Sequence, residues 1–255
     1  MLLFNLKAKF FLFLFENLKS IVKIIFFSKL KSGTCSRPKG VIQSQFKIIN
    51  NLYFRTQSSQ KTITCQASQF HHGASVLGFF SVLLNPNICM VYPSIKLDNP
   101  EDILISIEKY KCDCLYSLPK LLNHLMDIQL IKKFNLGSLN SIFCTGQPLL
   151  KSSMLRLKNE WNIKSLTYSY GMSEIMHVCY SHIELDNIET LNDSENFFQY
   201  KRLVPYFEFK IVNPETKQIE KLNVEGELHV RGFCVTKSYF DDNEKTMEAI
   251  NQDRW

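Results

Sequence analysis

The chain of 255 residues is long enough to bury a sizeable core and suits one or two domains. Hydrophobic residues make up 45% of it and charged residues 21%, which is ordinary for a globular protein. The net charge of +6 is concentrated in residues 1–31, which carry six lysines and one glutamate. The remainder is nearly neutral and gives no reason to propose nucleic-acid binding.

Residues 1–31 form an atypical leader that is rich in Phe and Lys. A signal peptide remains open, although no small-residue cleavage site follows cleanly, and the lysines and Glu16 differ from the Arg- and Ser-rich composition of a transit peptide. Its apolar run Phe10–Phe15 is too short to span a bilayer, which needs about 20 residues, so we expect no transmembrane segment. Eight cysteines lie at irregular spacings without a C-x-x-C pair, which is typical of reduced thiols in an intracellular protein.

A loop rich in small residues follows the first predicted strand. The apolar run Ile21–Phe27 predicts a buried strand, and the apolar spacing within Ser44–Thr56 predicts a helix. Between them, hydroxyls and glycine N–H groups can hold phosphate oxygens, and a lysine adds positive charge. The loop residues are Ser32, Gly33, Thr34, Cys35, Ser36, Arg37, Pro38, Lys39 and Gly40. Because the loop lacks the G-x-x-x-x-G-K-[ST] pattern of the common P-loop, a triphosphate cradle and a plain surface turn both remain open.

Strand and helix patterns alternate further along the chain. Buried strands are predicted over Ile88–Tyr92, Cys114–Ser117, Asn140–Cys144 and Lys164–Ser169. Helices are predicted over Ser75–Leu84, 101–111, Pro119–Ile128 and Leu149–Trp161. This alternation indicates an α/β fold, in which a parallel sheet is flanked by helices. After a polar loop, Asp186–Asn196, the strands predicted over Pro205–Val212 and Gly226–Gly232 indicate a small β-rich subdomain.

Ligands of parallel sheets bind at the carboxyl ends of the strands, where three candidate loops lie. Ser32–Gly40 is the first. The second is Thr145–Leu149, which contains Gly146, Gln147 and Pro148 and is equally consistent with a helix-entry turn.

The third loop, Tyr168–Glu174, has the residue types of a nucleotide site. The ring of Tyr170 can stack on a purine, and Gly171 allows close approach. The hydroxyl of Ser173 can reach a phosphate, and Glu174 can ligate Mg²⁺, which prefers oxygen ligands. A strand-end turn with a surface acid is the alternative interpretation.

These loops resemble the signatures of the adenylate-forming (AMP-binding) superfamily. Ser32–Gly40 resembles S-G-T-T-G-x-P-K-G, although Cys35 replaces the second threonine and Ser36 the middle glycine. Thr145–Leu149 resembles the G-A-P-L segment, and Tyr170–Glu174 resembles Y-G-x-T-E with serine for threonine.

The most specific resemblance lies near the end of the chain. Gly226–Gly232, Tyr239-Phe240, Glu244–Thr246 and Trp255 keep the spacing of the family's G-E-L-x-x-R-G … G-Y … P-E-x-T … G-W run. Ser238 replaces a glycine of this run. Likewise, 202–205 resembles G-R-x-x-P, with Lys201 in place of its glycine.

The resemblance implies the large N-terminal domain of an adenylate-forming enzyme. It is strongest to the mitochondrial medium-chain acyl-CoA synthetase branch, which implies a mitochondrial or cytoplasmic location. Its implied cofactors are ATP and Mg²⁺, with CoA as co-substrate and a fatty or other carboxylic acid as partner. The implied Mg²⁺ ligand is Glu174, and His71, after Phe70, would flank the acyl pocket. The implied ATP/AMP-binding residues are Ser32, Gly33, Thr34, Cys35, Ser36, Arg37, Pro38, Lys39, Gly146, Gln147, Pro148, Tyr170, Gly171, Met172 and Ser173.

The resemblance also sets the expected domain organisation. Residues 1–31 would be the leader, 32–185 a partial α/β AMP-binding core and 186–255 a partial β-rich subdomain. The family's T-G-D motif and its C-terminal lid domain with a catalytic lysine would follow Trp255 and are absent. We therefore expect this chain alone to retain no catalytic residue and to show no ATP–pyrophosphate exchange. Two alternatives remain open, a nucleotide- or acyl-binding module without catalysis and a ligase of an aryl or other acid.

Overall fold

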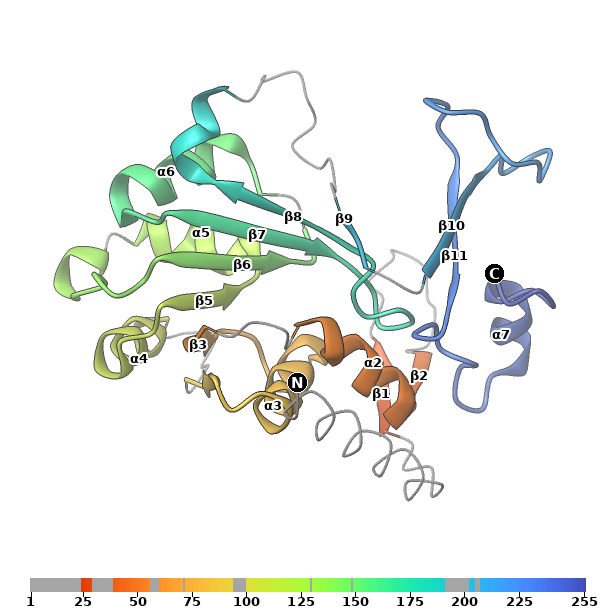
Figure 1. Cartoon of the computed structure of the whole chain (residues 1–255), viewed down its shortest axis with the longest axis horizontal. Helices are drawn as coiled ribbons and strands as arrows, with labels where there is room; N and C mark the ends of the chain where they lie inside the picture. Colours follow the sequence, from red (N-terminus) through yellow and green to blue (C-terminus); the bar gives the residue numbers. More distant parts are fainter. Residues whose placement is uncertain are drawn as a thin grey trace, which may run out of the picture.

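The structure is a computed structural model that describes residues 24–28, 39–55, 60–70, 72–93, 100–128, 130–147, 149–190, 202–204 and 207–255. Its main element is a seven-stranded sheet with the strand order β4-β3-β5-β6-β7-β8-β9 (Figure 1). These strands are β3 (Thr62–Gln66), β4 (Ile88–Val91), β5 (Cys114–Ser117), β6 (Ser141–Thr145), β7 (Ser165–Tyr170), β8 (Cys179–Glu184) and β9 (Arg202–Leu203).

The centre of this sheet is parallel. β3 pairs in parallel with β4 and β5, and the parallel pairing continues through β6 to β7. The register places Leu115, Ile142 and Leu166 side by side across β5, β6 and β7. β8 then runs antiparallel to β7, and β9 antiparallel to β8. The predicted α/β class is confirmed, with an antiparallel extension at one edge.

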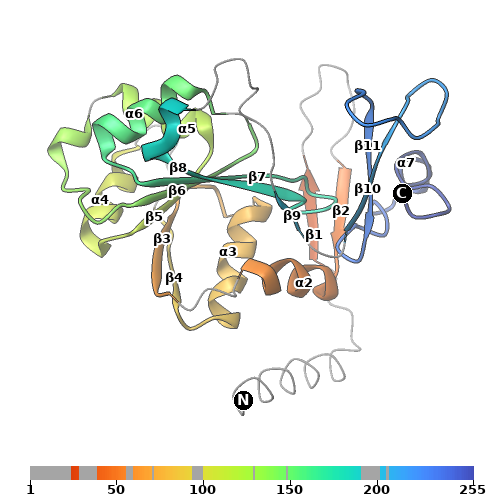
Figure 2. The same cartoon turned by 45° about the horizontal axis from the view of Figure 1, so that its top comes forward.

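Helices cover both faces of the sheet (Figure 2). On one face lie α4 (Glu101–Tyr110), α5 (Pro119–Asp127) and α6 (Lys151–Trp161), with the 3₁₀ helices η1 (Leu130–Lys133) and η2 (Leu185–Thr190). They bury a continuous apolar core with the strands, which includes Leu104, Leu125 and Leu157. On the other face lie α2 (Gln45–Arg55) and α3 (Gly73–Leu84), which contact each other through Leu52 and Leu77.

The first strand pair corrects one expectation. Ser32–Gly40 is predicted to connect a parallel strand to a helix, but β1 (Ile24–Ser28) pairs antiparallel with β2 (Lys39–Gln43), and β2 leads into α2. β1 and β2 therefore form an antiparallel pair, and Lys39 and Gly40 of the predicted loop lie in its second strand. A strand forms at 39–43 because Val41 and Gln43 alternate inward and are fully buried. Residues 29–38 lie outside the described part of the chain.

Other differences from the sequence prediction are local. β3 and β8 are additional strands, β7 extends to Tyr170, and η2 occupies the beginning of the predicted loop Asp186–Asn196. Seven cysteines are free in the described part of the chain, and five of them are buried. No helix in this part of the chain has the length and apolar character needed to cross a membrane.

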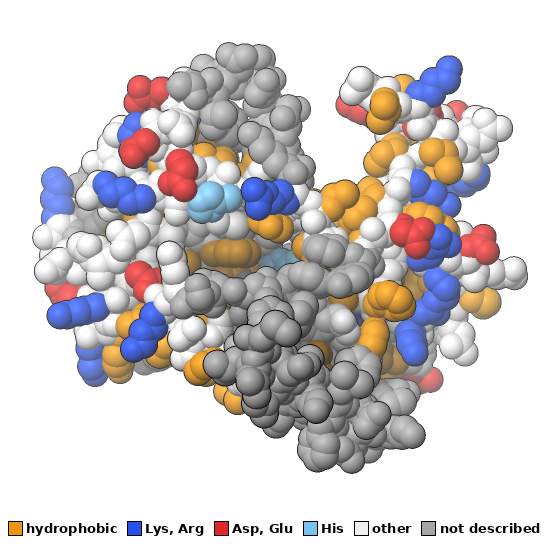
Figure 3. Space-filling view, viewed as in Figure 1, with side chains coloured by type: hydrophobic (Ala, Val, Ile, Leu, Met, Phe, Trp, Pro, Cys, Tyr) orange, Lys and Arg blue, Asp and Glu red, His pale blue; other side chains and the backbone are white. Residues whose placement is uncertain are grey.

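A separate arm projects beside the large sheet. It consists of β10 (Phe207–Val212) paired antiparallel with β11 (Glu227–Gly232), followed by α7 (Asn243–Ala249). Trp255 packs against it, with Lys210 Nζ 4.1 Å and the Arg231 guanidinium carbon 4.5 Å from the ring centre. In Figure 3 the upper part of this arm stands apart from the described part of the sheet body. Val230 packs with Ile175 and Val178 and joins the two parts.

Candidate functional site

The carboxyl ends of β6 and β7 lie side by side at the site. Thr145 pairs with Ser169, and its Oγ1 donates a hydrogen bond to the Ser169 carbonyl oxygen at 2.9 Å. Directly after Thr145, Gly146 has a φ of +89°, a left-handed conformation that side chains rarely adopt. The predicted loops after β6 and β7 therefore meet at one edge of the sheet, and a glycine is needed where the first one turns.

The segment Gly171–Val178, which we call the β7–β8 loop, folds tightly back on itself. The Val178 N–H donates to the Tyr170 carbonyl oxygen at 2.9 Å. A Cβ atom on Gly171 would lie 1.5 Å from the Met176 carbonyl oxygen, so the loop requires glycine there. This shape exposes Met172 and leaves Ser173 and Glu174 half-buried.

Three polar side chains from β2 and α2 hold the backbone of the β7–β8 loop. Gln43 Nε2 donates to the Ser173 carbonyl oxygen at 2.7 Å. Lys47 Nζ donates to the carbonyl oxygens of Ser173 and Glu174, at 2.8 Å each. Asn51 Oδ1 accepts from the His177 N–H at 3.3 Å. These contacts tie the loop to the segment that directly follows the predicted phosphate cradle.

Lys47 is unusual because its side chain is almost completely buried, with 1% of the residue exposed. Burial lowers the pKa of its amine to about 7, although the nearby Glu174 carboxylate and Cys234 act to raise it. Burial also raises the pKa of the Cys234 thiol, to about 11. Burying a lysine amine costs free energy unless the amine makes hydrogen bonds. Here two backbone carbonyls accept them.

Two motif residues, Lys39 and Glu174, converge on the ring of Tyr239. The Tyr239 hydroxyl donates to Glu174 Oε1 at 2.8 Å, while Lys39 Nζ lies 5.0 Å from the centre of the ring. Burial, followed by the contact with the Glu174 carboxylate, raises the pKa of the Tyr239 hydroxyl. The structure thus brings together the lysine of the cradle motif, the predicted metal ligand and the tyrosine of the C-terminal motif.

The remaining predicted residues are placed as follows. Tyr170 ends β7, and its half-buried ring packs on the apolar cluster that contains Ile175 and Val230. Gln147 is exposed. The predicted site residues outside the described part of the chain are Ser32, Gly33, Thr34, Cys35, Ser36, Arg37, Pro38, Pro148 and His71. Their roles stay predictions.

The sequence prediction missed the residues that hold the loop. Lys47 and Asn51 are four residues apart and lie on one face of α2, and this spacing of two polar residues was the available signal, whereas Gln43 lies in β2 and gave none. His177 was also missed, and its Nδ1 lies 3.0 Å from Ser169 Oγ. His72 is the N-cap of α3, where its Nδ1 accepts from the Ala74 N–H.

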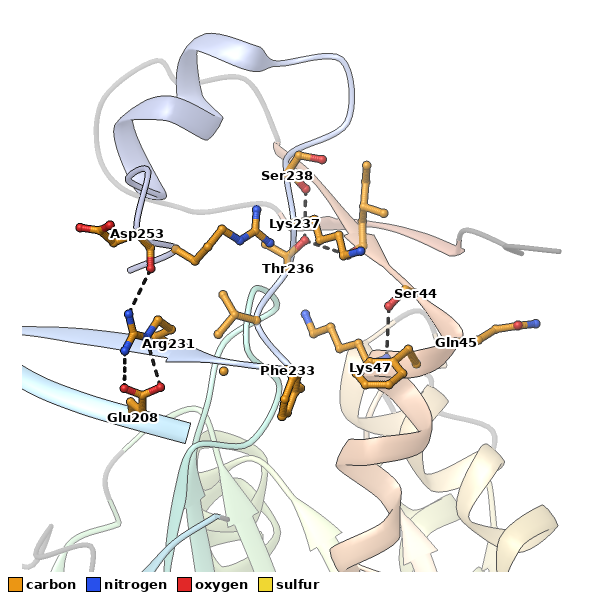
Figure 4. A pocket seen from close by; sticks show the side chains of 15 residues that line it. Ser44, Gln45, Lys47, Glu208, Arg231, Phe233, Thr236, Lys237, Ser238 and Asp253 are labelled. Carbon is orange, nitrogen blue, oxygen red and sulfur yellow. Dashed lines mark hydrogen bonds and ion pairs between the residues drawn. The ribbon is translucent and has the colours of Figure 1, made fainter. Parts of the chain in front are cut away.

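A cavity of about 840 Å³ lies beside this site, between α2 and the arm (Figure 4). Lys47, Thr236 and Ser238 line it, but Lys39 and Glu174 do not. Among the described residues, Ser238 is not one of those with positive φ, so serine in place of the family's glycine causes no left-handed strain there.

A Mg²⁺ ion would fit Glu174 only with oxygen ligands from elsewhere. Within the described residues, no group of three His, Cys, Asp or Glu side chains could hold a metal ion. Glu174 is half-buried, Tyr239 fixes its Oε1, and no described residue bonds its Oε2. One carboxylate oxygen presented in this way suits Mg²⁺, which commonly binds one or two carboxylates together with phosphates and water.

Comparison with known proteins gives one matching family and similar ligases. The family described as AMP-binding enzymes matches residues 30–240. A mitochondrial medium-chain acyl-CoA ligase of Danio rerio is 30% identical over 229 residues, which are 88% of this chain and 37% of the relative. An acyl-CoA ligase of Ajellomyces capsulatus is 29% identical over 226 residues, with 87% and 37% covered. The chain thus spans about 37% of the length of these relatives.

Solved structures of similar fold cover most of the chain. O-succinylbenzoate coenzyme A synthetase of Bacillus subtilis, in complex with AMP, has a TM-score of 0.70 at 19% identity, over 91% of this chain and 44% of that one. A luciferase-like enzyme of the mealworm Zophobas morio has a TM-score of 0.69 at 23% identity, over 90% and 52%. At these identities the likenesses establish the fold alone.

Proposed function

Because the chain belongs to the family of AMP-binding enzymes, we propose that it forms the nucleotide-binding part of an ATP-dependent acyl-CoA ligase. The ligase would activate a carboxylate with ATP to an acyl-adenylate and then pass the acyl group to CoA. The curated relatives are named acyl-CoA ligases, which supports this class of reaction. The convergence of Lys39 and Glu174 on Tyr239 carries the proposal, because it assembles a cation and a fixed carboxylate at one place.

In this proposal each part of the site has one task. Lys39 and the cradle residues before it bind the anionic phosphates, and the Ser173 hydroxyl donates to the α-phosphate. Tyr170 and the loop after β6 bind the adenine. Glu174 would hold Mg²⁺, which supplies neutralisation of the phosphate charge when bound. Catalysis of this kind depends on positioning and on electrostatic stabilisation, and a well-fixed loop favours both.

The domain organisation and location are parts of the same proposal. Residues 32–185 would form the nucleotide-binding core and 186–255 the β-rich subdomain. The carboxylic acid would enter near His71, and the mitochondrial relatives favour a mitochondrial location.

Nucleotide binding is the test that this chain can meet by itself. Isothermal titration should show saturable binding of Mg·ATP and AMP, and weaker binding of Mg·GTP. Glu174→Gln should weaken Mg·ATP binding by about tenfold or more, because a ligand oxygen of the metal is lost. Its matched control, Glu160→Gln on the exposed side of α6, should leave Mg·ATP binding unchanged. Absence of saturable adenine-nucleotide binding would contradict the proposal.

A nonhydrolysable acyl-adenylate mimic separates the ligase from a nucleotide-binding module. An acyl-sulfamoyl adenosine carries both the adenosine and the acyl chain. If the site also binds the acyl group, this compound should bind more tightly than AMP, with an affinity that depends on chain length. Equal affinity for AMP and for mimics of every chain length would instead support the module.

A further inference from the structure

Glu174 is held at its backbone and at its side chain by different parts of the chain. Its carbonyl oxygen accepts hydrogen bonds from Lys47 Nζ at 2.8 Å and from the Thr236 N–H at 2.7 Å. Its Oε1 accepts from the Tyr239 hydroxyl at 2.8 Å. Helix α2 therefore fixes the residue from one side and the segment after β11 from the other.

We propose that Lys47 is a positioning residue, whose side-chain amine bridges the carbonyl oxygens of Ser173 and Glu174 and thereby aims the Glu174 carboxylate at its ligand. This inference rests on the proposed function, in which the Glu174 carboxylate would hold the Mg²⁺ ion that binds the phosphates of ATP. Lys47 does not touch the nucleotide in this proposal and acts only through the β7–β8 loop.

Lys47 differs from its neighbours in the hydrogen bonds that it makes to the loop. Among the described residues, Lys47 is the only side chain that bonds both carbonyls, since Gln43 reaches only Ser173. The two acceptors belong to the two peptide units that flank the Cα atom of Glu174, so one amine fixes the backbone on both sides of that residue. An apolar side chain at position 47 would leave part of this hydrogen bonding unmade in a buried place.

Burial shows that the amine is directed inward. Lysine normally places its amine in water, yet this residue is 1% exposed although it lines an open cavity (Figure 4). Its near neighbours Glu174 and Cys234 come from the β7–β8 loop and from the segment after β11. Lys47 therefore lies where the three segments that build the site meet.

The first experiment uses the nucleotide-free chain. Hydrogen exchange by mass spectrometry would follow peptides that cover residues 171–178, with peptides of β6 as internal reference. Lys47→Met should speed exchange of the β7–β8 loop by about tenfold and leave β6 unchanged, because two carbonyl contacts are lost. Lys120→Met, at an exposed position on α5, is the matched control and should change neither. Unchanged exchange of the loop in Lys47→Met would overturn the inference.

The second experiment measures a ratio of two affinities, which a general loss of stability would not change. The ratio of the Mg·ATP affinity to the metal-free AMP affinity should fall by about tenfold in Lys47→Met, because only the first ligand uses the Glu174 carboxylate. If Lys47→Met weakened the binding of Mg·ATP and of AMP by the same factor, the positioning role would be overturned. Gln43→Leu should loosen the loop at Ser173 but keep the ratio, and a ratio that falls as far as in Lys47→Met would also overturn it.

Two further outcomes keep the inference distinct from the proposed function. If the wild-type chain binds no adenine nucleotide but Lys47→Met still loosens the loop, the function fails while the structural role of Lys47 stands. If Lys47→Met does not fold, Lys47→Gln replaces it, since glutamine keeps a donor but is too short to bridge both carbonyls. It should shift loop exchange and the affinity ratio in the same direction by a smaller factor, and no shift in either would overturn the inference.

Discussion

The two faces of the large sheet are covered in different ways. On the face of α4, α5 and α6, the buried core is mainly apolar, with Ser153 as a buried polar residue of α6, and Leu104, Leu125 and Leu157 have no exposed surface. On the face of α2 and α3, buried polar side chains lie among the apolar ones. They include Gln43, Lys47, Asn51, Gln66, Ser68, Ser75, Ser81 and Asn85.

The difference teaches how this fold divides its tasks. Apolar burial is non-directional, so the first face can hold the sheet together without fixing any single group. Hydrogen bonds have directions, and those of the second face fix chosen backbone groups. Gln43 and Lys47 bond the β7–β8 loop, and Ser75 Oγ donates to the Ser68 carbonyl oxygen at 2.9 Å. We therefore expect mutations on the first face to change stability and mutations around the second to change the site.

The strongest test of this division is Leu157→Ala. The substitution removes a fully buried side chain from the apolar face and should lower the free energy of unfolding by about 2–5 kcal/mol. Urea denaturation measures this loss, and Mg·ATP affinity of the folded fraction should not change. Leu150→Ala, next to the same helix but 65% exposed, is the control. A changed nucleotide affinity in Leu157→Ala would break the division.

Unlike Leu157→Ala, Gly171→Ala should change nucleotide binding as well as stability. The new Cβ would collide with the Met176 carbonyl oxygen, so the β7–β8 loop must shift. We expect the free energy of unfolding to fall by roughly 1–3 kcal/mol and Mg·ATP binding to be largely lost. Gly137→Ala, where the Cβ would meet only the Asn135 side chain, should leave both nearly unchanged. Full binding by Gly171→Ala would show that the loop shape does not define the site.

Alkaline pH should weaken the apolar face through Cys144. Burial raises the pKa of this thiol from 9 to about 12, so the native state keeps a proton that the unfolded state loses above pH 9. Stability is therefore complete below pH 9 and falls as pH rises toward 12. Cys144 alone should lower the free energy of unfolding by roughly 1.4 kcal/mol between pH 8 and pH 10.

Denaturation of Cys144→Ala at both pH values checks this contribution. The variant should lose less stability between them than the wild type, whereas Cys89→Ala, at an exposed thiol, should behave as the wild type. The same pH dependence in Cys144→Ala and the wild type would contradict the assignment.

Tyr239→Phe should have the smallest effect on stability and a clear effect on the site. It removes the hydrogen bond to Glu174 Oε1, which should cost about 1 kcal/mol of unfolding free energy. The carboxylate becomes free to rotate, so Mg·ATP affinity should fall severalfold more than AMP affinity. Tyr110→Phe, on the exposed side of α4, serves as the control. If both ligands weaken equally, the hydroxyl does not orient the metal ligand.

Much of the fold could be predicted because its helices and central strands carry strong apolar patterns. Cys114–Ser117 is found with the bounds that the sequence predicts, and α5 differs by one residue. The missed strands lack such a pattern. β3 has the sequence T-I-T-C-Q, and β2 includes a lysine, a glycine and a glutamine, so their burial depends on neighbours that the local sequence does not show.

The site could be predicted only in part, for a related reason. Motif spacing identified Lys39, Glu174 and Tyr239 but not their contact, because Tyr239 lies 65 residues beyond Glu174. Lys47 lies 126 and 127 residues from the carbonyls that it bonds. Sequence spacing shows what shares a helix face or a loop, whereas contacts of this range are created by the topology of the sheet.

The two tryptophans of the chain give each region its own optical signal. Trp161 is 5% exposed within the apolar core, and its indole should emit at short wavelength because no water relaxes around it. Trp255 is half-exposed and lies between Lys210 and Arg231 on the arm, so its emission should be red-shifted and sensitive to salt. A Trp161→Phe variant therefore turns the end of the chain into a fluorescent probe of the arm. A Trp255→Phe variant does the same for the core.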